Sequence, residues 1–363
     1  MKLVDIIAGA RPNFIKVSPI IRSLKEKQKL GNSNLRFRLI HTGQHYDKKM
    51  SNDFFKQLGI PNPNINFNVG SGSQADQTSA IMIAYEKLLL KKPSDLCLVV
   101  GDVNSTLACS ISAKKLSIPV AHVEAGLRSG DLTMPEEINR ILTDAITDFF
   151  FTTSSYANEN LIRSGVPSKN IFFVGNTMID TLKENLDKLI EPKIFKTLNK
   201  KKYLVLTLHR PSNVDNSANL KNILKELSQA AEGLEILFPV HPRTAKILNK
   251  INFHPKNVKF LDPLSYLEFI FIVKNSSAVI TDSGGITEET TYLKIPCLTL
   301  RDSTERPETI VVGTNKLLGR NPNKLKFYLK KIIEGKWKKG KIPQKWDGKT
   351  SKRIVDIIEK KLQ

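Results

Sequence analysis

The sequence predicts an α/β protein built from two doubly wound, Rossmann-like domains with a cleft between them. Apolar runs of about four to eight residues, rich in β-branched side chains, recur along the chain. They are continuous rather than alternating, and most are separated by segments with helical spacing, which is typical of parallel sheets covered on both faces. At 363 residues the chain is also too long for one ordinary core.

Each expected element follows from this pattern. The expected strands are Leu3–Ala8, Phe37–His41, Leu96–Val100, Pro119–His122, Phe149–Thr153, Ile171–Val174, Tyr203–Leu208, Glu235–Val240, Val258–Leu261, Ala278–Thr281 and Pro296–Leu300. The expected helices include Ile15–Lys29, Thr78–Leu90, Ser105–Leu116, Ala218–Ala231, Tyr266–Lys274, Asn323–Gly335 and Thr350–Leu362. We place the first domain at residues 1–175 and the second at 176–345. The last residues, 346–363, form a helix expected to pack back on the first domain.

The composition excludes several classes of protein. There is no run of about 18 apolar residues, so no membrane span is expected. The first residues are interrupted too soon for a signal peptide and indicate a strand. Cys97, Cys109 and Cys297 lie far apart in apolar surroundings without metal-ligand spacing. We therefore expect a cytoplasmic protein with reduced core cysteines and no metal site.

The charge is strongly positive and unevenly distributed. The net charge is +21, and residues 321–363 carry 14 Lys and Arg against 4 Asp and Glu. Lysines beside Trp337 and Trp346 are compatible with binding to nucleic acid or an anionic membrane. We favour solvated lysine-rich faces instead, because no nucleic-acid motif accompanies the charge. A basic cleft would also attract a dianionic nucleotide sugar.

The loop after the first strand is Gly9-Ala-Arg-Pro-Asn-Phe-Ile-Lys16. In a parallel sheet this loop lies at the carboxyl edge, where ligands bind, so Arg11 and Lys16 are candidates to hold a pyrophosphate. The alternative is a simple helix start with Pro12 at its first position. The loop lacks the Gly-x-Gly-x-x-Gly spacing of dinucleotide folds, which argues against a nicotinamide cofactor.

Three further segments bring carboxylates to the same expected edge. Asp102 follows one strand, Glu124 follows the next, and Glu136 lies in a helix that opens at Pro135 and carries Arg140. Asp102 is equally well interpreted as a helix cap, and Glu136 with Arg140 as an exposed ion pair. Neither alternative explains three loops that all deliver Asp or Glu. Carboxylates gathered in this way are suited to general acid/base chemistry.

The second half of the chain contains an anion-binding pattern. Asp282-Ser-Gly-Gly285 opens a helix, where glycines let the backbone approach a phosphate. Glu289 lies too deep in that helix to cap it and is a candidate to accept the hydroxyls of a ribose. His209 follows the first strand of this domain, and a structural role for it is as plausible as a functional one.

Taken together, these motifs resemble the non-hydrolysing UDP-N-acetylglucosamine 2-epimerases, two-domain proteins similar to GT-B glycosyltransferases. The resemblance extends from the first strand to the last helix. It rests on Gly9-Ala-Arg-Pro, Lys16, His41-Thr-Gly-Gln-His45, Gly101-Asp102, His122-Val-Glu-Ala-Gly-Leu-Arg128, Pro135-Glu-Glu, Asn139-Arg140, His209-Arg210, Asp282-Ser-Gly-Gly285 and Glu305-Arg-Pro307.

This resemblance implies a homodimeric enzyme of surface-polysaccharide precursor synthesis that needs no cofactor. It interconverts UDP-GlcNAc and UDP-ManNAc by eliminating UDP to a 2-acetamidoglucal and adding it back. The implied acid/base residues are Asp102, Glu124 and Glu136, with Arg140 supporting them and His209 assisting the diphosphate. The implied substrate-binding residues are Arg11, Lys16, Phe269, Ser283, Gly284, Gly285, Glu289 and Arg306. A possible regulatory site for a second UDP-sugar corresponds to Gln44, His45 and His241.

Some features depart from the family pattern or leave alternatives open. The segment from Asp131 to Pro135 is shorter than in many members, Ser212 stands where others have Glu, and Thr287 replaces a frequent Gln. The residues do not decide which carboxylate takes the first proton. The alternatives to UDP-GlcNAc are a deoxy, diacetamido or uronate relative of it. A UDP-dependent glycosyltransferase is the nearest other enzyme class, and a nucleic-acid or anionic-surface binding protein is the alternative outside enzymes.

Overall fold

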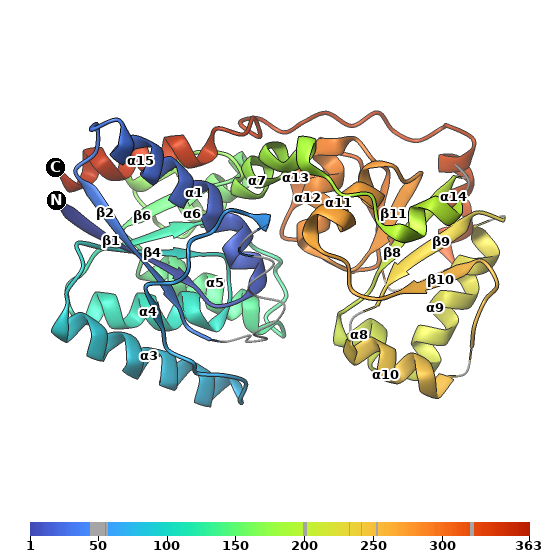
Figure 1. Ribbon diagram of the computed structural model, residues 1–363, viewed down its shortest axis with the longest axis horizontal. Helices are drawn as coiled ribbons and strands as arrows, with labels where there is room; N and C mark the ends of the chain where they lie inside the picture. Colours follow the sequence, from blue (N-terminus) through green and yellow to red (C-terminus); the bar gives the residue numbers. More distant parts are fainter. Residues whose placement is uncertain are drawn as a thin grey trace. The chain divides into compact units, whose positions relative to one another are not determined.

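The structure is a computed structural model, and it describes residues 1–43, 55, 57–198, 202–231, 233–240, 242–251, 253–319 and 323–363. The chain divides into two units. The first comprises Met1–Glu184 and Gln344–Gln363, and the second comprises Asn185–Pro343. Figure 1 shows a parallel sheet with helices on both faces in each unit.

The first unit contains a seven-stranded parallel sheet in the order β3-β2-β1-β4-β5-β6-β7. Its strands are β1 (Lys2–Ala8), β2 (Leu35–His41), β3 (Ile65–Asn66), β4 (Leu96–Val100), β5 (Val120–Val123), β6 (Phe149–Thr152) and β7 (Ile171–Phe173). Its helices are α1 (Arg11–Lys29), α3 (Gln74–Lys91), α4 (Asn104–Lys115), α5 (Pro135–Ala145), α6 (Ser155–Arg163), α7 (Thr177–Asn185) and α15 (Thr350–Leu362). The strand order reverses its direction of growth between β1 and β4, which makes this edge of the sheet a ligand-binding position in doubly wound folds.

The second unit has a six-stranded parallel sheet in the order β10-β9-β8-β11-β12-β13. Its strands are β8 (Tyr203–Thr207), β9 (Glu235–Pro239), β10 (Val258–Leu261), β11 (Ala278–Thr281), β12 (Cys297–Thr299) and β13 (Asn315–Leu317). Its helices are α8 (Pro211–Val214), α9 (Ser217–Ala230), α10 (Pro242–Ile251), α11 (Tyr266–Lys274), α12 (Gly284–Leu293), α13 (Pro307–Val311) and α14 (Lys324–Ile333). One buried cluster joins the sheet to α9 and α14, and a second joins its other face to α11 and α12. The predicted α/β class, with two parallel sheets, is therefore confirmed.

The central strands form where the sequence is continuously apolar. All five residues of β4 are buried, and so are all four of β5 and of β11. A strand covered on both faces has no solvent side, so alternation disappears from its sequence. The same burial accounts for the three cysteines, which are all free and buried.

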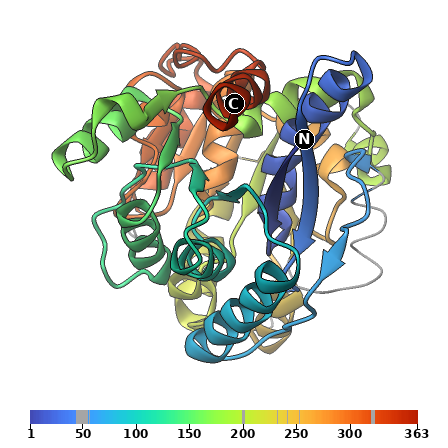
Figure 2. The same cartoon turned by 90° about the vertical axis from the view of Figure 1, so that its left-hand side faces the viewer.

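The end of the chain belongs to the first unit. The carboxylate of Asp180 on α7 accepts hydrogen bonds from the backbone N–H groups of Thr350 and Ser351, at 3.1 and 2.7 Å, and so caps α15. The indole of Trp346, 1% exposed, donates to the carbonyl of Thr153 at 3.1 Å. Figure 2 shows α15 beside α1, with which it packs. Because α7 is tied to these neighbours, the first unit extends to Glu184, beyond the expected boundary at 175.

No helix among the described residues has the length and apolar character needed to cross a membrane.

Candidate functional site

The candidate residues of the first unit lie at the carboxyl ends of β1, β4 and β5. The loop after β1 is shaped by Asn13, whose side-chain oxygen accepts the N–H groups of Gly9 and Ala10 at 3.2 and 2.9 Å. The amide nitrogen of Asn13 donates to the carbonyl of Val100 at the end of β4. This bond ties the two loops together. Arg11 is exposed at the first position of α1.

Glu124 and Lys16 form the central contact of this edge. The Lys16 ammonium lies 2.6 Å from Oε2 of Glu124, and their side chains are 12% and 2% exposed. Glu124 has a φ of 72°, a left-handed conformation that is rare for a residue with a side chain and concentrates at functional sites. Gly101 faces the pair, since a Cβ built there would lie 3.3 Å from the Lys16 nitrogen.

His122 holds the loops of this arrangement in place, a role that the sequence did not suggest. Its Nε2 lies 2.8 Å from the carbonyl of Gly101, and its Nδ1 lies 2.8 Å from a carboxylate oxygen of Asp144. Asp144 also accepts the N–H of Gly126 at 3.0 Å. The imidazole, which is fully buried, therefore holds the loops after β4 and β5 at a fixed spacing.

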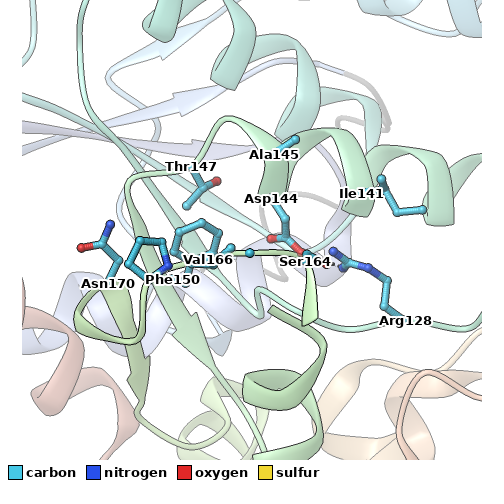
Figure 3. A pocket seen from close by; sticks show the side chains of 11 residues that line it. Arg128, Ile141, Asp144, Ala145, Thr147, Phe150, Ser164, Val166 and Asn170 are labelled. Carbon is cyan, nitrogen blue, oxygen red and sulfur yellow. Dashed lines mark hydrogen bonds and ion pairs between the residues drawn. The ribbon is translucent and has the colours of Figure 1, made fainter. Parts of the chain in front are cut away.

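Asp144 is ionised by its neighbours despite its burial. Burial alone raises the pKa of Asp144, but the hydrogen bonds and charges of His122 and Arg128 outweigh it, so the pKa lies below its ordinary value. Figure 3 shows Asp144 and Arg128 in the lining of a cavity of about 510 Å³ between α5, β6 and the connection from α6 to β7.

The helix α5 brings Arg140 to Asp102. The Nε of Arg140 lies 3.4 Å from Oδ2 of Asp102, and a terminal nitrogen lies 3.0 Å from Oε2 of Glu137. Arg140 is 2% exposed. The interpretation of Glu136 and Arg140 as an exposed ion pair four residues apart is wrong. Arg140 forms its ion pair with Glu137, three residues before it, and its contact with Glu136 is a hydrogen bond to the backbone carbonyl.

Glu137 is a second residue whose role the sequence did not reveal. Its carboxylate accepts the N–H groups of Ser129 and Gly130, at 2.9 and 3.1 Å, in addition to its contact with Arg140. It therefore joins the loop that follows Glu124 to the helix that carries Glu136, whose side chain is half-buried. The neighbouring residues Glu136 and Glu137 therefore have different environments, although the sequence does not distinguish them.

In the second unit the anion-binding pattern lies at the start of α12. Ser283, Gly284 and Gly285 are partly exposed, whereas the following residues of the helix are buried. The side chain of Ser283 does not cap the helix. A Cβ on Gly284 would lie 2.3 Å from a carboxylate oxygen of Glu305, so a larger residue here would force that carboxylate, which is paired with Arg301, to move. The first N–H groups of a helix in such a position are suited to an anionic ligand.

Asp282 fixes His209 beside this helix. The carboxylate of Asp282 accepts the backbone N–H groups of His209 and Arg210, and the side chain of Asn213 donates to it at 3.0 Å. The Nδ1 of His209 lies 2.9 Å from the same carboxylate, and the ring is 53% exposed. Burial by itself raises the pKa of Asp282. Its hydrogen bonds with His209 and Asn213 lower the pKa by more than burial raises it, so the pKa lies below its ordinary value. A fixed, accessible imidazole is able to exchange a proton with a ligand.

Three buried acidic residues, Glu288, Glu289 and Glu305, lie in and beside α12. Glu288, on α12, forms an ion pair with Arg306. Its neighbour Glu289 is 4% exposed and accepts the hydroxyl of Tyr266 at 3.0 Å. Burial is the main cause that raises the pKa of Glu289 to about 8; the charge of Glu288 adds to the shift and the Tyr266 hydrogen bond opposes it. The third acid, Glu305, pairs with an arginine four residues before it.

The other expected residues are placed as follows. Phe269 is half-buried on α11 and packs on the cluster between α11 and α12. Gln44, His45 and His241 lie outside the described residues. In the part of the chain that the structure describes, no group of three or more His, Cys, Asp or Glu side chains is arranged to hold a metal ion.

The structure thus gathers the candidates into two sets. In the first unit, contacts link Lys16 to Glu124 and Asp102 to Arg140, with Glu136 on the same helix as Arg140. In the second unit, His209 lies against the residue that precedes the Ser-Gly-Gly turn, and Glu289 and Arg306 lie in and beside α12.

Comparison with known proteins identifies the family. A family model described as UDP-N-acetylglucosamine 2-epimerase matches residues 28–359. The chain belongs to this family. It is 45% identical to the UDP-N-acetylglucosamine 2-epimerase of Methanocaldococcus jannaschii, with 99% of each chain covered. A crystal structure of the M. jannaschii enzyme in complex with UDP-GlcNAc and UDP superimposes with a TM-score of 0.85, at 43% identity and 99% coverage of both chains.

A second relative acts on a different sugar. The chain is 38% identical to the UDP-2,3-diacetamido-2,3-dideoxy-D-glucuronate 2-epimerase of Pseudomonas aeruginosa, over 88% of each chain.

The resemblance noted in the sequence is therefore confirmed at the level of the family, and the protein is an epimerase with the GT-B type of fold.

Proposed function

We propose that this epimerase interconverts UDP-GlcNAc and UDP-ManNAc in the cytoplasm, by elimination and re-addition of UDP. The observation that carries the proposal is the Lys16–Glu124 contact at the β1, β4 and β5 edge, together with 45% identity to the M. jannaschii enzyme over 99% of both chains. Binding of UDP-GlcNAc and UDP by that relative supports a UDP-sugar as substrate.

The chemistry explains why carboxylates are needed. The proton on C2 of the sugar is not next to a carbonyl, so its removal alone is unfavourable. If a carboxylate takes this proton while the bond from C1 to the diphosphate oxygen breaks, a C1=C2 double bond forms and no unstable carbanion is required. A proton then adds to the other face of C2, and the diphosphate oxygen bonds to C1 again. The cycle is balanced and consumes nothing.

We assign the proton transfers to Asp102, Glu124 and Glu136. Lys16 compensates the charge of Glu124, whose side chain is almost fully buried, and Arg140 compensates the charge of Asp102, whose side chain is partly exposed. The three groups come from different segments, as an acid and a base acting on opposite faces of one carbon require.

We assign the diphosphate to the start of α12 and to basic side chains. Ser283, Gly284 and Gly285 offer helix N–H groups, and His209 is held where its ring remains accessible. Arg11 and Lys16 in the first unit and Arg306 in the second complete the proposed set, with Glu289 at the ribose and Phe269 near the uracil.

We also propose that the enzyme acts as a homodimer.

The relative from P. aeruginosa supports a second candidate, a UDP-2,3-diacetamido uronate as substrate. The two are separated by measuring kcat/KM for both sugars with the purified chain and chromatographic separation of the epimers. We expect the higher value for UDP-GlcNAc. A higher value for the uronate would transfer the proposal to that sugar, and conversion of neither would refute both.

A further inference from the structure

The helix α14 presents an exposed face with an unusual composition. Its inner side, with Leu325, Leu329 and Ile332, packs into the core of the second unit. Phe327 lies on the opposite side of the helix and is 58% exposed. The ammonium of Lys331 lies 4.5 Å from the centre of the Phe327 ring. The solvent side of α14 is thus both apolar and basic.

The segment 336–342 extends this face along the edge of the sheet. The indole of Trp337 donates to the carbonyl of Thr314 at 2.9 Å, and the N–H of Lys341 donates to the carbonyl of Val312 at 2.8 Å. These bonds attach the segment beside β13, the last strand in the sheet order. A stretch of chain that itself carries lysines therefore lies against the residues that lead into β13.

Apolar side chains protrude from the same region. Val311, at the end of α13, is 68% exposed, and Ile342, just beyond the bond that attaches the segment to α13, is 41% exposed. With Phe327 they are among the most exposed large apolar residues of the second unit. Single exposed apolar side chains are ordinary on a protein surface, so these three support an interaction site only together with the lysines of the same region.

The charge of this region is almost uncompensated. Eight lysines lie between residues 323 and 343, all of them exposed, and Glu334 is the one acid in that range. Glu334 pairs with two of them, Lys330 and Lys336. The pKa of Lys338 is lowered, first by partial burial and then by the positive charge of Lys316. Like charges are thus crowded together in the free protein, and an anionic partner would relieve their repulsion.

We propose that this surface, formed by α14, segment 336–342 and the exposed Val311, docks on an anionic lipid surface. The lysines are attracted to the acidic headgroups, while Phe327, Val311 and Ile342 enter the boundary between headgroups and acyl chains. Peripheral membrane binding needs such a combination, because either a few charges or a few apolar groups alone give weak attachment.

The composition favours lipid over nucleic acid. Nucleic-acid recognition relies heavily on arginine, whose planar group binds phosphate and guanine in a bidentate manner. All basic residues from 323 to 343 are lysines, which act as point charges and need no defined geometry. Exposed aliphatic side chains such as Val311 and Ile342 have no base to stack on but suit a lipid boundary.

The test measures sedimentation of the full chain with vesicles of phosphatidylcholine alone or mixed two to one with phosphatidylglycerol. A face variant removes four lysines by the changes Lys326→Gln, Lys330→Gln, Lys331→Gln and Lys339→Gln. A matched control removes the same charge from exposed sites in the first unit by the changes Lys87→Gln, Lys91→Gln, Lys92→Gln and Lys115→Gln. Unchanged thermal unfolding and UDP binding verify that both variants are folded.

We expect binding to the anionic vesicles that falls about 100-fold or more in the face variant, since each lysine near the surface contributes about fivefold. The control should fall about threefold or less. Phe327→Ala should abolish the binding that persists at high salt. Equal losses in the face variant and the control would reduce the effect to net charge and overturn the proposal. Tighter binding to a short DNA duplex than to vesicles, unaffected by Phe327→Ala, would assign the face to nucleic acid instead.

Discussion

The exchange of Glu137 for glutamine tests whether this buried residue joins the loop that follows Glu124 to the helix that carries Glu136. Oε2 of Glu137 lies 3.0 Å from Arg140 and accepts the N–H and hydroxyl of Ser129, while Oε1 accepts the N–H of Gly130. An amide retains one acceptor oxygen and turns an NH₂ group toward one of these donors. One charged hydrogen bond is therefore lost, and Arg140 loses half of its compensation.

The expected cost is about 2–4 kcal/mol in the free energy of unfolding of the first unit, because a lost bond to a charged group and an undercompensated buried arginine add up. The buried Trp346 reports on that unit, so the measurement uses urea unfolding followed by its fluorescence in a Trp337→Phe background. Glu136→Gln is the matched control and should change the free energy by about 0.5 kcal/mol or less. Equal stabilities of the Glu137→Gln and Glu136→Gln variants would refute the reasoning.

Further predictions concern ligand binding, steric fit and chemistry. Glu289, with its pKa raised to about 8, is mostly protonated at neutral pH, and we propose that the ionised form accepts the ribose hydroxyls. Affinity for UDP should therefore rise with pH, by up to about tenfold between pH 7 and 9 as the ionised fraction grows. Calorimetry that shows the same slope for Glu289→Gln would exclude this cause. Gly284→Ala should lower the free energy of unfolding by about 1–3 kcal/mol through its clash with Glu305. Gly285→Ala, with no neighbour within 4 Å of the added carbon, should not destabilise α12, and equal thermal shifts for the two glycines would contradict the packing argument. Glu124→Gln should bind UDP like the wild type but lose epimerisation by about two orders of magnitude or more; near-normal turnover would remove Glu124 from the proton-transferring set.

The fold was predictable from the sequence where strands are buried on both faces. Continuous apolar runs located β4, β5 and β11 to within one residue. The strands β3 and β13 were missed, because each has only two or three residues at the edge of its sheet and only partial burial. Edge strands of this length have too little apolar sequence to be distinguished from loops.

The site was predictable only in outline. The position of Asp102 and Glu124 after neighbouring strands followed from the parallel topology, but the left-handed backbone of Glu124 has no sequence signature. The roles of His122 and Glu137 depend on contacts with residues 7 to 22 positions away, and no local pattern indicates them. The difference between Glu136 and Glu137 is likewise set by which one faces Arg140.

The central claim is proton transfer at C2 coupled to reversible loss of UDP, and proton NMR of the purified chain with UDP-GlcNAc in D₂O tests it most directly. No metal or nicotinamide is added. The proposed function predicts that UDP-ManNAc appears and that deuterium accumulates at C2 of both sugars. Formation of UDP-ManNAc with the original hydrogen at C2, or no exchange with any UDP-2-acetamido sugar while UDP still binds, would contradict it.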